Sequence, residues 1–376
     1  MTDASNPFLI SGYISPKYFC DREDETKKLV KNIDNGNNVT LISTRRMGKS
    51  GLIKHCFEQR SIKKNYTTFF VDIYATKSFN DFLLLMSKSI CEELKSSGRK
   101  MLDGFLLSIK SMRPEISLDA VGKPSISFNM GNVTNPDTSL DEIFKFLNSS
   151  AKPCIVAIDE FQQITNYPQT NMEALLRTYI QKSPLTRFIF SGSSRHIMGE
   201  MFNSAKRPFF ASTSTIYLDA IPKQKYIEFV QNIFEENRKK ITADTVEKIY
   251  DLFEGITWYM QKVLNLLYSE TAKGKVCRHE TVDFAVREIV ASNRYVYSEN
   301  MFRLPDKQGK MLIAIAKDGN VVSPTSSDFI RKHALVSASS AQSALYGLLE
   351  KEFVTRDERG YRTYDMFFER WLKDTF

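Results

Sequence analysis

Residues 43–50 have the types and spacing that bind phosphate groups. They read Ser-Thr-Arg-Arg-Met-Gly-Lys-Ser, the pattern G-x-x-x-x-G-K-[ST] with serine at the first glycine. The apolar run Val39–Ile42 precedes them and a helical pattern over 52–57 follows, which is the strand–loop–helix setting that such a loop needs. Loop N–H groups and the positive end of the following helix attract anions. The segment therefore predicts a phosphate-binding loop, with a chance match in a basic turn as the alternative.

Each residue of this loop has an expected role. Lys49 would contact the β- and γ-phosphates of a nucleotide, and the Ser50 hydroxyl would bind Mg²⁺. Ser43 must fit a tight turn that glycine would enter without steric cost. Arg45 and Arg46 would stabilise phosphate charge or pair with acids, and we expect one of the two to be structural. The predicted nucleotide-binding residues are Ser43, Thr44, Arg45, Arg46, Met47, Gly48, Lys49, Ser50 and Gly51.

Two adjacent acids supply the second half of the predicted chemistry. Asp159 and Glu160 follow the apolar run Cys154–Ile158, which is typical of a buried parallel strand. Asp159 would hold Mg²⁺ through water, and Glu160 would orient and activate the attacking water. The alternative is an exposed acidic strand end. The Asp-Glu pair favours hydrolysis of ATP, and the chain has no downstream [NT]-K-x-D guanine-reading motif that would indicate GTP.

Composition excludes several other classes of protein. The chain has 376 residues, 42% of them hydrophobic, without an apolar stretch of the ~18–20 residues that span a membrane. Its five cysteines lack C-x-x-C spacing, so we expect reduced thiols, and the four histidines show no zinc-ligand spacing. The N-terminal residues do not resemble a signal peptide, and a cytoplasmic protein is expected. The net charge of +8 is spread evenly and leaves no basic segment.

The periodicity of residues 1–220 predicts an α/β nucleotide-binding domain with a parallel sheet. A β-hairpin insertion is expected at about 111–136, because period-two alternation flanks Val121-Gly122-Lys123. The expected strands are Val39–Ile42, Thr67–Tyr74, Ile155–Ile158, Arg187–Phe190 and Thr215–Leu218. The expected helices cover 22–33, 50–60, 79–96, 138–149 and 171–182.

Two further domains are predicted behind it. Residues 221–299 contain four amphipathic runs, at 223–240, 243–253, 258–272 and 280–291, which is typical of a helical lid. Residues 300–376 contain three helical patterns, a β-ribbon around the turn 357–360 and a closing helix from Phe367, which together predict a winged helix-turn-helix.

These motifs together resemble AAA+-type P-loop ATPases of bacteria and archaea that carry a C-terminal winged helix, relatives of STAND NTPases and origin-recognition initiators. The matching segments are the box 19–25, with Phe19, Arg22, Glu23 and Glu25, the loop 44–50, the acids 159–160, the turn 190–194 and the motif 365–371. The resemblance implies that the box packs near an adenine. The sequence departs from the family pattern at two positions. Ser43 stands at the first glycine of the loop, and Trp258 stands where relatives have proline in a lid motif.

The resemblance implies two further catalytic candidates besides Lys49 and Glu160. Ser193 or its neighbour Ser191 would sense the γ-phosphate, although a serine in such a turn also often serves only the backbone. Arg207 would be an arginine finger that reaches the nucleotide of a neighbouring subunit, and this role would require a homo-oligomer. Its alternative is a basic loop that contacts solvent or the lid.

The sequence of the winged helix leaves open whether this domain binds DNA or a protein. Its third helix, at 337–349, contains no lysine or arginine, so only Gln342 and serines are available there for reading bases. Arg331, Lys332, Arg359 and Arg362 could contact a DNA backbone. The sequence therefore predicts a Mg²⁺-dependent ATP-hydrolysing switch that contacts DNA or a protein. The alternatives are a STAND-like scaffold that binds ATP with little or no turnover and, less favoured, a small-molecule kinase.

Overall fold

The computed structural model describes residues 4–97, 99–112, 114–118, 124–128, 133, 135–169 and 171–376. The chain forms two compact units, which are called here the sheet unit (Ser11–Tyr226) and the helical unit (Met1–Ile10 with Ile227–Phe376). Across the described ranges, no helix is both long and apolar enough to cross a bilayer. All five cysteines are buried free thiols, and burial raises the pKa of three of them, Cys20, Cys56 and Cys91, to about 12.

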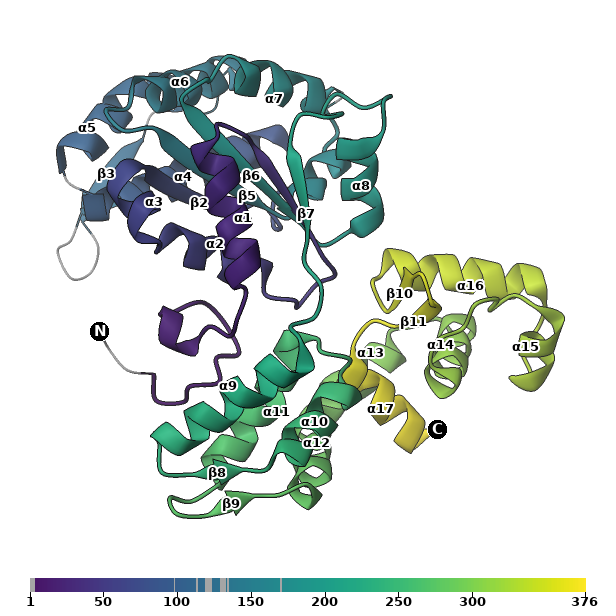
Figure 1. The fold of residues 1–376 in the computed structure, drawn as a ribbon. Coiled ribbons are helices and arrows are strands. Elements are labelled where there is room, and N and C mark those ends of the chain that lie inside the picture. Colours follow the sequence, from purple (N-terminus) through teal and green to yellow (C-terminus); the bar gives the residue numbers. More distant parts are fainter. Residues whose placement is uncertain are drawn as a thin grey trace. The chain divides into compact units, whose positions relative to one another are not determined.

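A five-stranded parallel sheet organises the sheet unit (Figure 1). Its strands are β1 (Val39–Ile42), β2 (Thr67–Asp72), β5 (Cys154–Asp159), β6 (Thr186–Gly192) and β7 (Ser214–Tyr217). They lie in the order β2-β5-β6-β1-β7, so β6 separates β1 from β5. All four pairings are parallel, which brings the carboxyl ends of the strands to one edge. The predicted α/β parallel-sheet class is confirmed, and each expected strand forms within two residues of its predicted bounds.

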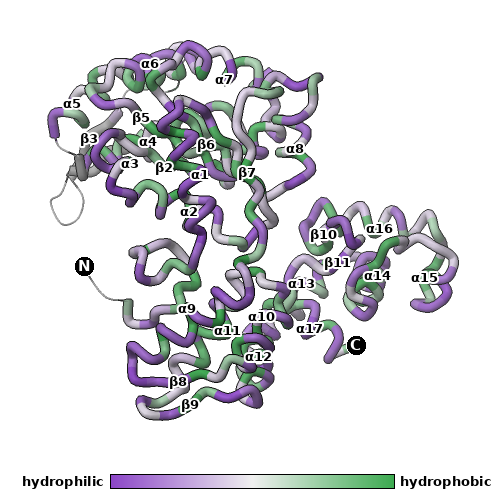
Figure 2. The backbone as a smooth tube through the Cα atoms, viewed as in Figure 1, coloured by the Kyte–Doolittle hydropathy of each residue, from purple (hydrophilic) through white to green (hydrophobic). Residues whose placement is uncertain are grey.

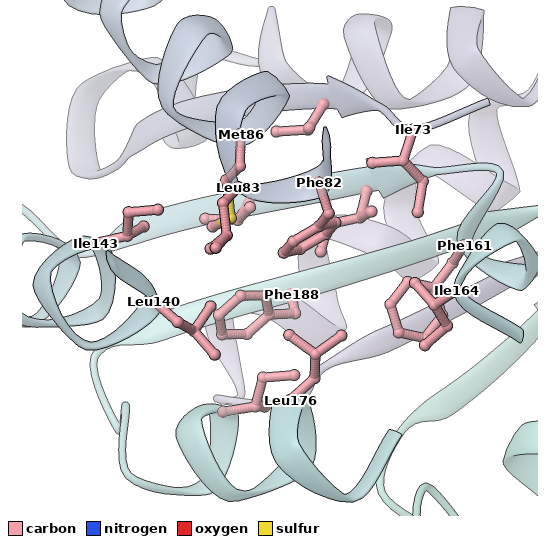
Figure 3. Packing of buried hydrophobic residues seen from close by; sticks show 14 of the residues in the cluster. Ile73, Phe82, Leu83, Met86, Leu140, Ile143, Phe161, Ile164, Leu176 and Phe188 are labelled. Carbon is pink, nitrogen blue, oxygen red and sulfur yellow. The ribbon is translucent and has the colours of Figure 1, made fainter. Parts of the chain in front are cut away.

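Both faces of this sheet are covered by helices, and its inner strands β1, β5 and β6 are accordingly buried along nearly their whole length. Strands β5 and β6 are mostly hydrophobic segments of the tube (Figure 2), and every residue of β5 is buried. On one face, side chains from α4, α6, α7 and the 3-10 turn η4 pack around Phe188 (Figure 3). On the other side, α1 contacts β1 and α2. The bounds are α1 (Glu23–Asp34), α2 (Lys49–Phe57), α3 (Arg60–Asn65), α4 (Phe79–Ser97), α6 (Pro136–Ser149), η4 (Phe161–Asn166), α7 (Met172–Gln181) and α8 (Arg195–Asn203).

An insertion separates β2 from β5. It contains α4, which was expected at 79–96, and two strands, β3 (Glu115–Leu118) and β4 (Pro124–Ser127). It also contains α5 (Arg99–Ser108), a helix that the sequence patterns did not predict. These strands pair antiparallel with Ile116 opposite Ile126. The predicted turn at Val121-Gly122-Lys123 lies outside the described residues.

The helical unit contains two groups of helices. The first comprises α9 (Lys223–Glu236), α10 (Ala243–Leu252), α11 (Thr257–Glu270) and α12 (Glu280–Ser292), with short strands β8 (Lys240–Ile241) and β9 (Val276–Cys277). The N-terminal segment packs on this group: Phe8 is fully buried beside Phe234 and Tyr268. Trp258 donates its indole N–H to the carbonyl of Ile10 at 3.0 Å. Trp258 therefore anchors the N-terminal segment from the position where relatives would carry a proline.

The second group is the winged helix, which confirms the prediction for this end of the chain. It contains α14 (Asp306–Asp318), α15 (Ser327–Lys332), α16 (Ala338–Glu350), the ribbon β10 (Val354–Asp357) and β11 (Gly360–Thr363), and α17 (Met366–Thr375), with α13 (Arg294–Phe302) before it. An aromatic cluster of Phe253, Trp258, Tyr259 and Phe367 joins it to α10 and α11. The backbone N–H of Met366 also donates to the Tyr259 hydroxyl at 3.1 Å.

Candidate functional site

The carboxyl edge of the sheet collects motifs that are far apart in the sequence. Ser43 follows β1, Asp159 ends β5, and Ser193 follows β6. In the register, Ile42 lies opposite Gly192, and Ile158 lies opposite Phe190. Because β6 is the shared neighbour, the phosphate loop and the acidic strand end face each other across the end of β6. Open α/β sheets commonly bind ligands at this edge.

The phosphate loop has the backbone shape of an anion site. Arg46 and Gly48 adopt left-handed conformations, with φ of 69° and 90°. At Gly48 an added Cβ would meet open space, so glycine is favoured there by backbone conformation and not by crowding. Lys49 then begins α2. A left-handed turn followed by a helix N-terminus is the backbone arrangement that binds phosphate oxygens in other proteins.

Lys49 lies across this loop. Its ammonium donates to the Ser43 hydroxyl at 3.2 Å and to the Thr44 carbonyl at 3.3 Å. Ser43 is fully buried and does not have a positive φ, so serine replaces the first glycine without backbone strain. Burial lowers the pKa of Lys49, whereas Glu160 and Asp159 nearby favour its charged form. A buried ammonium with this acidic surrounding is suited to bind phosphate oxygens.

Ser50 and Asp159 meet although they are 109 residues apart. The Ser50 hydroxyl donates to Asp159 Oδ2 at 2.5 Å. Asp72, at the end of β2, lies opposite Asp159 in the register. Burial raises the pKa of Asp72, the Tyr74 N–H lowers it, and the charges of Asp159 and Glu160 raise it further. A divalent cation would relieve this repulsion between carboxylates.

These donors fit Mg²⁺ better than a metal held by protein alone. In the part of the chain that the structure describes, no group of three or more His, Cys, Asp or Glu side chains could hold a metal ion. Mg²⁺ usually keeps several waters and takes one or two protein ligands together with substrate phosphates. The Ser50 hydroxyl and the Asp159 carboxylate match that donor set.

Glu160 is held by two side chains. Its Oε2 accepts hydrogen bonds from the Ser193 hydroxyl at 2.6 Å and from the Gln162 amide at 2.5 Å. Gln162 also donates to Ser193 at 3.3 Å. Ser191 is fully buried, and its hydroxyl has no hydrogen-bond partner among the described residues. Of the two candidate serines, Ser193 is therefore the one that the structure brings to Glu160.

The box at 19–25 packs directly against the phosphate loop. Arg22 is 3% exposed, donates to Glu25 at 2.8 Å and reaches the Met47 carbonyl at 3.5 Å. Phe19 stacks on the imidazole of His55 with ring centroids 4.4 Å apart. An added Cβ at Gly51 would lie 3.4 Å from the Phe19 ring, so the box contacts the beginning of α2 closely.

The loop arginines and Arg207 have different surroundings. The guanidinium of Arg45 lies 4.8 Å from the centre of the Tyr74 ring. Arg207 forms ion pairs with Glu173 and with Glu200 of its own chain, the latter at 3.3 Å. The structure therefore brings together Lys49, Ser50, Asp159, Glu160 and Ser193, whereas Arg207 has its partners on α7 and α8.

Three residues of this edge were not predicted from the sequence. Asp72 and Gln162 are described above, and Arg195 begins α8 directly after the Ser193-Ser194 turn. Arg195 pairs with Asp219, which follows β7, at 3.3 Å. Because β1 lies between β6 and β7, this ion pair spans the end of β1, where the phosphate loop begins. Polar or charged residues at or shortly after strand ends were the available signal, but only the strand order shows that they converge.

The four basic residues of the winged helix that were expected to contact a DNA backbone are paired with acids. Arg331 pairs with Asp328 and Lys332 with Asp318, both at 2.7 Å. Arg359 and Arg362 pair with Glu254, at 2.6 and 2.8 Å, and Arg362 is only 7% exposed. The exposed residues of α16 are Ala338, Ser339, Gln342, Ser343, Tyr346 and Glu350.

Solved structures share this fold along the whole chain. A Walker-type ATPase of Pyrococcus abyssi superposes with a TM-score of 0.66 at 16% sequence identity, covering 98% of this chain and 99% of that one. The Aeropyrum pernix ORC2 protein, in ADPNP-ADP complexes, has a TM-score of 0.58 at 13% identity, with 98% and 95% covered. The Aeropyrum pernix ORC1 protein, in complex with DNA, has a TM-score of 0.54 at 15% identity, with 99% and 97% covered.

Sequence comparison identifies the family. No curated protein matches the sequence significantly. Residues 295–374 match a family described as a probable winged helix domain. Residues 19–263, more than half of the chain, match the family described as an ATPase domain predominantly from Archaea. The chain thus belongs to this ATPase-domain family and carries a winged helix behind the ATPase domain.

Proposed function

We propose that this protein is a Mg²⁺-dependent ATPase that works as a nucleotide-controlled switch. The contact between Ser50 and Asp159, with Lys49 and Glu160 at the same sheet edge, is the observation that supports this most. The family to which the chain belongs is one of ATPase domains. ATP is favoured over GTP because the sequence lacks a guanine-reading motif.

The residues at the sheet edge have separate tasks in this proposal. Lys49 and the loop N–H groups bind the phosphates. Arg195 adds positive charge near Lys49. Mg²⁺, held by Ser50 and Asp159, would neutralise phosphate charge. Glu160 orients the attacking water and accepts its proton, with Ser193 fixing its carboxylate.

The helical unit carries the output of the switch. The aromatic cluster around Tyr259 and Phe367 and the ion pairs of Glu254 bind the winged helix to α10 and α11. A movement of these helices therefore moves the winged helix with them, as expected when a ligand shifts a two-state equilibrium.

We propose a protein as the partner of the winged helix. Its Arg331, Lys332, Arg359 and Arg362 are already paired with acids, and Arg362 is buried. DNA binding depends on cations that neutralise phosphates. Val336, just before α16, and Tyr346, on α16, are 74% and 65% exposed. Exposed apolar and aromatic side chains suit a protein contact. DNA is the second candidate, since the ORC1 protein with this fold is in complex with DNA.

One experiment tests activity and partner class together. We expect ATP turnover that requires Mg²⁺ and stops with EDTA, and that does not change when duplex DNA is added. Labelled duplex DNA should bind weakly at ~50 mM salt and be released by ~200 mM, because the four cations expected to contact a DNA backbone are already paired with acids. Turnover that rises with DNA, together with binding that survives ~200 mM salt, would favour the DNA alternative. Tight ATP binding without turnover would favour the non-hydrolysing scaffold.

Arg207 offers a test for a shared active site. As an arginine finger it must leave Glu173 and Glu200 to reach a neighbouring subunit. In that case turnover per chain rises with protein concentration. Arg207→Ala then removes this rise and lowers the rate by about 10³-fold or more. The matched control is Lys206→Ala, an adjacent cation. If turnover per chain is the same at all concentrations in the wild type and in Arg207→Ala, the finger role is excluded.

A further inference from the structure

Gln162 has an unusual place at the hydrolytic edge. It belongs to the short 3-10 turn η4, which begins directly after Glu160. Glu160 itself adopts a left-handed conformation, with φ 56° and ψ 41°, which is uncommon for a residue with a side chain. This sharp turn after β5 directs the chain so that the side chains of Glu160 and Gln162 lie within hydrogen-bonding distance at 2.5 Å.

The contacts fix the orientation of the Gln162 amide. A carboxylate oxygen only accepts hydrogen bonds, so the amide NH₂ group must face Glu160. The same NH₂ group lies 3.3 Å from the Ser193 hydroxyl, which in turn donates to Glu160 at 2.6 Å. Both donors end on Oε2 of Glu160. Its other carboxylate oxygen, Oε1, is therefore left for the attacking water.

Gly192 makes room for this arrangement. A Cβ added at Gly192 would lie 2.4 Å from Gln162 Oε1 and 2.5 Å from Met198, which is too close for any real contact. The side-chain amide oxygen of Gln162, Oε1, is buried there without a hydrogen-bond partner in the described ranges. Burying an unpartnered amide oxygen is unfavourable, and the two hydrogen bonds of the NH₂ group offset this cost.

We propose that Gln162 is a positioning residue for ATP hydrolysis, which holds Glu160 Oε2 together with Ser193 and so aims Oε1 at the attacking water. This inference rests on the proposed ATPase function. In this proposal Gln162 affects the rate only through Glu160. The hydrogen bonds of its side-chain amide go to Glu160 and Ser193, and not to the phosphate loop or the Ser50–Asp159 pair. It therefore acts on the chemical step and not on nucleotide binding.

The test is steady-state ATP turnover of the full chain with Gln162→Ala and the isosteric Gln162→Glu. We expect kcat to fall about 10- to 100-fold, since misplacement of a catalytic group by ~1 Å can cost about 100-fold, while KM for ATP stays within about twofold. Gln162→Glu should be at least as slow as Gln162→Ala, because it keeps the shape but removes the donor and adds a like charge. Gln163→Ala is the control, since the Gln163 amide bonds to the Thr76 carbonyl at 2.8 Å, away from Glu160.

A double mutant separates positioning from a general structural effect. If Gln162 acts through Glu160, Gln162→Ala combined with Glu160→Gln is no slower than Glu160→Gln alone. Additive losses, or a normal kcat in Gln162→Glu, would overturn the inference while leaving the ATPase function intact. A wild type that binds ATP but shows no turnover would overturn the hydrolytic function, and this role with it.

Discussion

Glu160→Gln is expected to lower ATP turnover by about 10²- to 10⁴-fold while ATP binding stays near the wild-type level. The substitution keeps the size of the side chain and removes the group that accepts the proton of water. The Glu160 carboxylate accepts hydrogen bonds from Ser193 and Gln162, neither of which belongs to the phosphate loop. Phosphate release and binding of a fluorescent ATP analogue, measured on the same preparation, check both parts of this expectation.

Lys49→Ala is the matched variant, and in it we expect ATP binding itself to be weakened. Lys49 lies inside the loop, where its ammonium would bond to phosphate oxygens, and a hydrogen bond to a charged group contributes ~1.5–3 kcal/mol. We expect ATP affinity to fall about 10- to 100-fold or more. Unchanged ATP affinity in Lys49→Ala would refute the phosphate-loop assignment, and unchanged turnover in Glu160→Gln would refute the role of Glu160 as the base.

The sequence predicted the strands of the sheet closely because buried parallel strands are short, continuous apolar runs. Cys154–Asp159 and Val39–Ile42 are such runs, and each ends at a polar motif. The residue types of the phosphate loop follow from local chemistry, since a left-handed turn favours glycine and a phosphate favours lysine. These features depend on residues close together in the chain, so they can be read without knowing the strand order.

The features that escaped prediction depend on long-range geometry. The pairing of Gln162 with Ser193 requires β6 to lie beside β5, and the ion pair of Arg195 with Asp219 requires β1 to lie between β6 and β7. The partners of Arg207 and Arg362 are likewise set by packing, so neither arginine could be recognised as ion-paired from the sequence. The segment 4–10 packs on α9 and α11 through Phe8 for the same reason.

Glu254→Gln is expected to lower the unfolding free energy of the helical unit by about 2–3 kcal/mol. Glu254 accepts from Arg362 at 2.8 Å and from Arg359 at 2.6 Å, and the substitution leaves the buried Arg362 without a counter-charge. Removing one partner of a fully buried pair costs ~3–5 kcal/mol, and the smaller value reflects that Glu254 is 33% exposed. Both tryptophans of the chain, Trp258 and Trp371, lie in the helical unit, so their fluorescence during urea unfolding reports this unit alone.

Glu299→Gln is the matched control. Glu299 pairs with Arg303 on the surface of α13, with both side chains more than half exposed, and such pairs contribute only ~0.2–1 kcal/mol. The two variants remove the same charge from the same unit. Equal urea midpoints for Glu254→Gln and Glu299→Gln would show that Glu254 does not hold the winged helix to α10. A lower midpoint for Glu254→Gln alone would support that link.

The pH dependence of this difference identifies its origin. Burial acts to raise the pKa of Glu254, but the hydrogen bonds and charges of Arg359 and Arg362 outweigh burial and lower it below the ordinary value of 4.5. A carboxyl group with a lowered folded-state pKa contributes stability that is complete above its unfolded-state pKa and is lost as the pH falls through the folded-state value. The stability difference between wild type and Glu254→Gln should therefore be constant above about pH 5.5 and shrink below about pH 4.5. A difference that persists unchanged into strong acid would come from altered packing and not from the charge of Glu254.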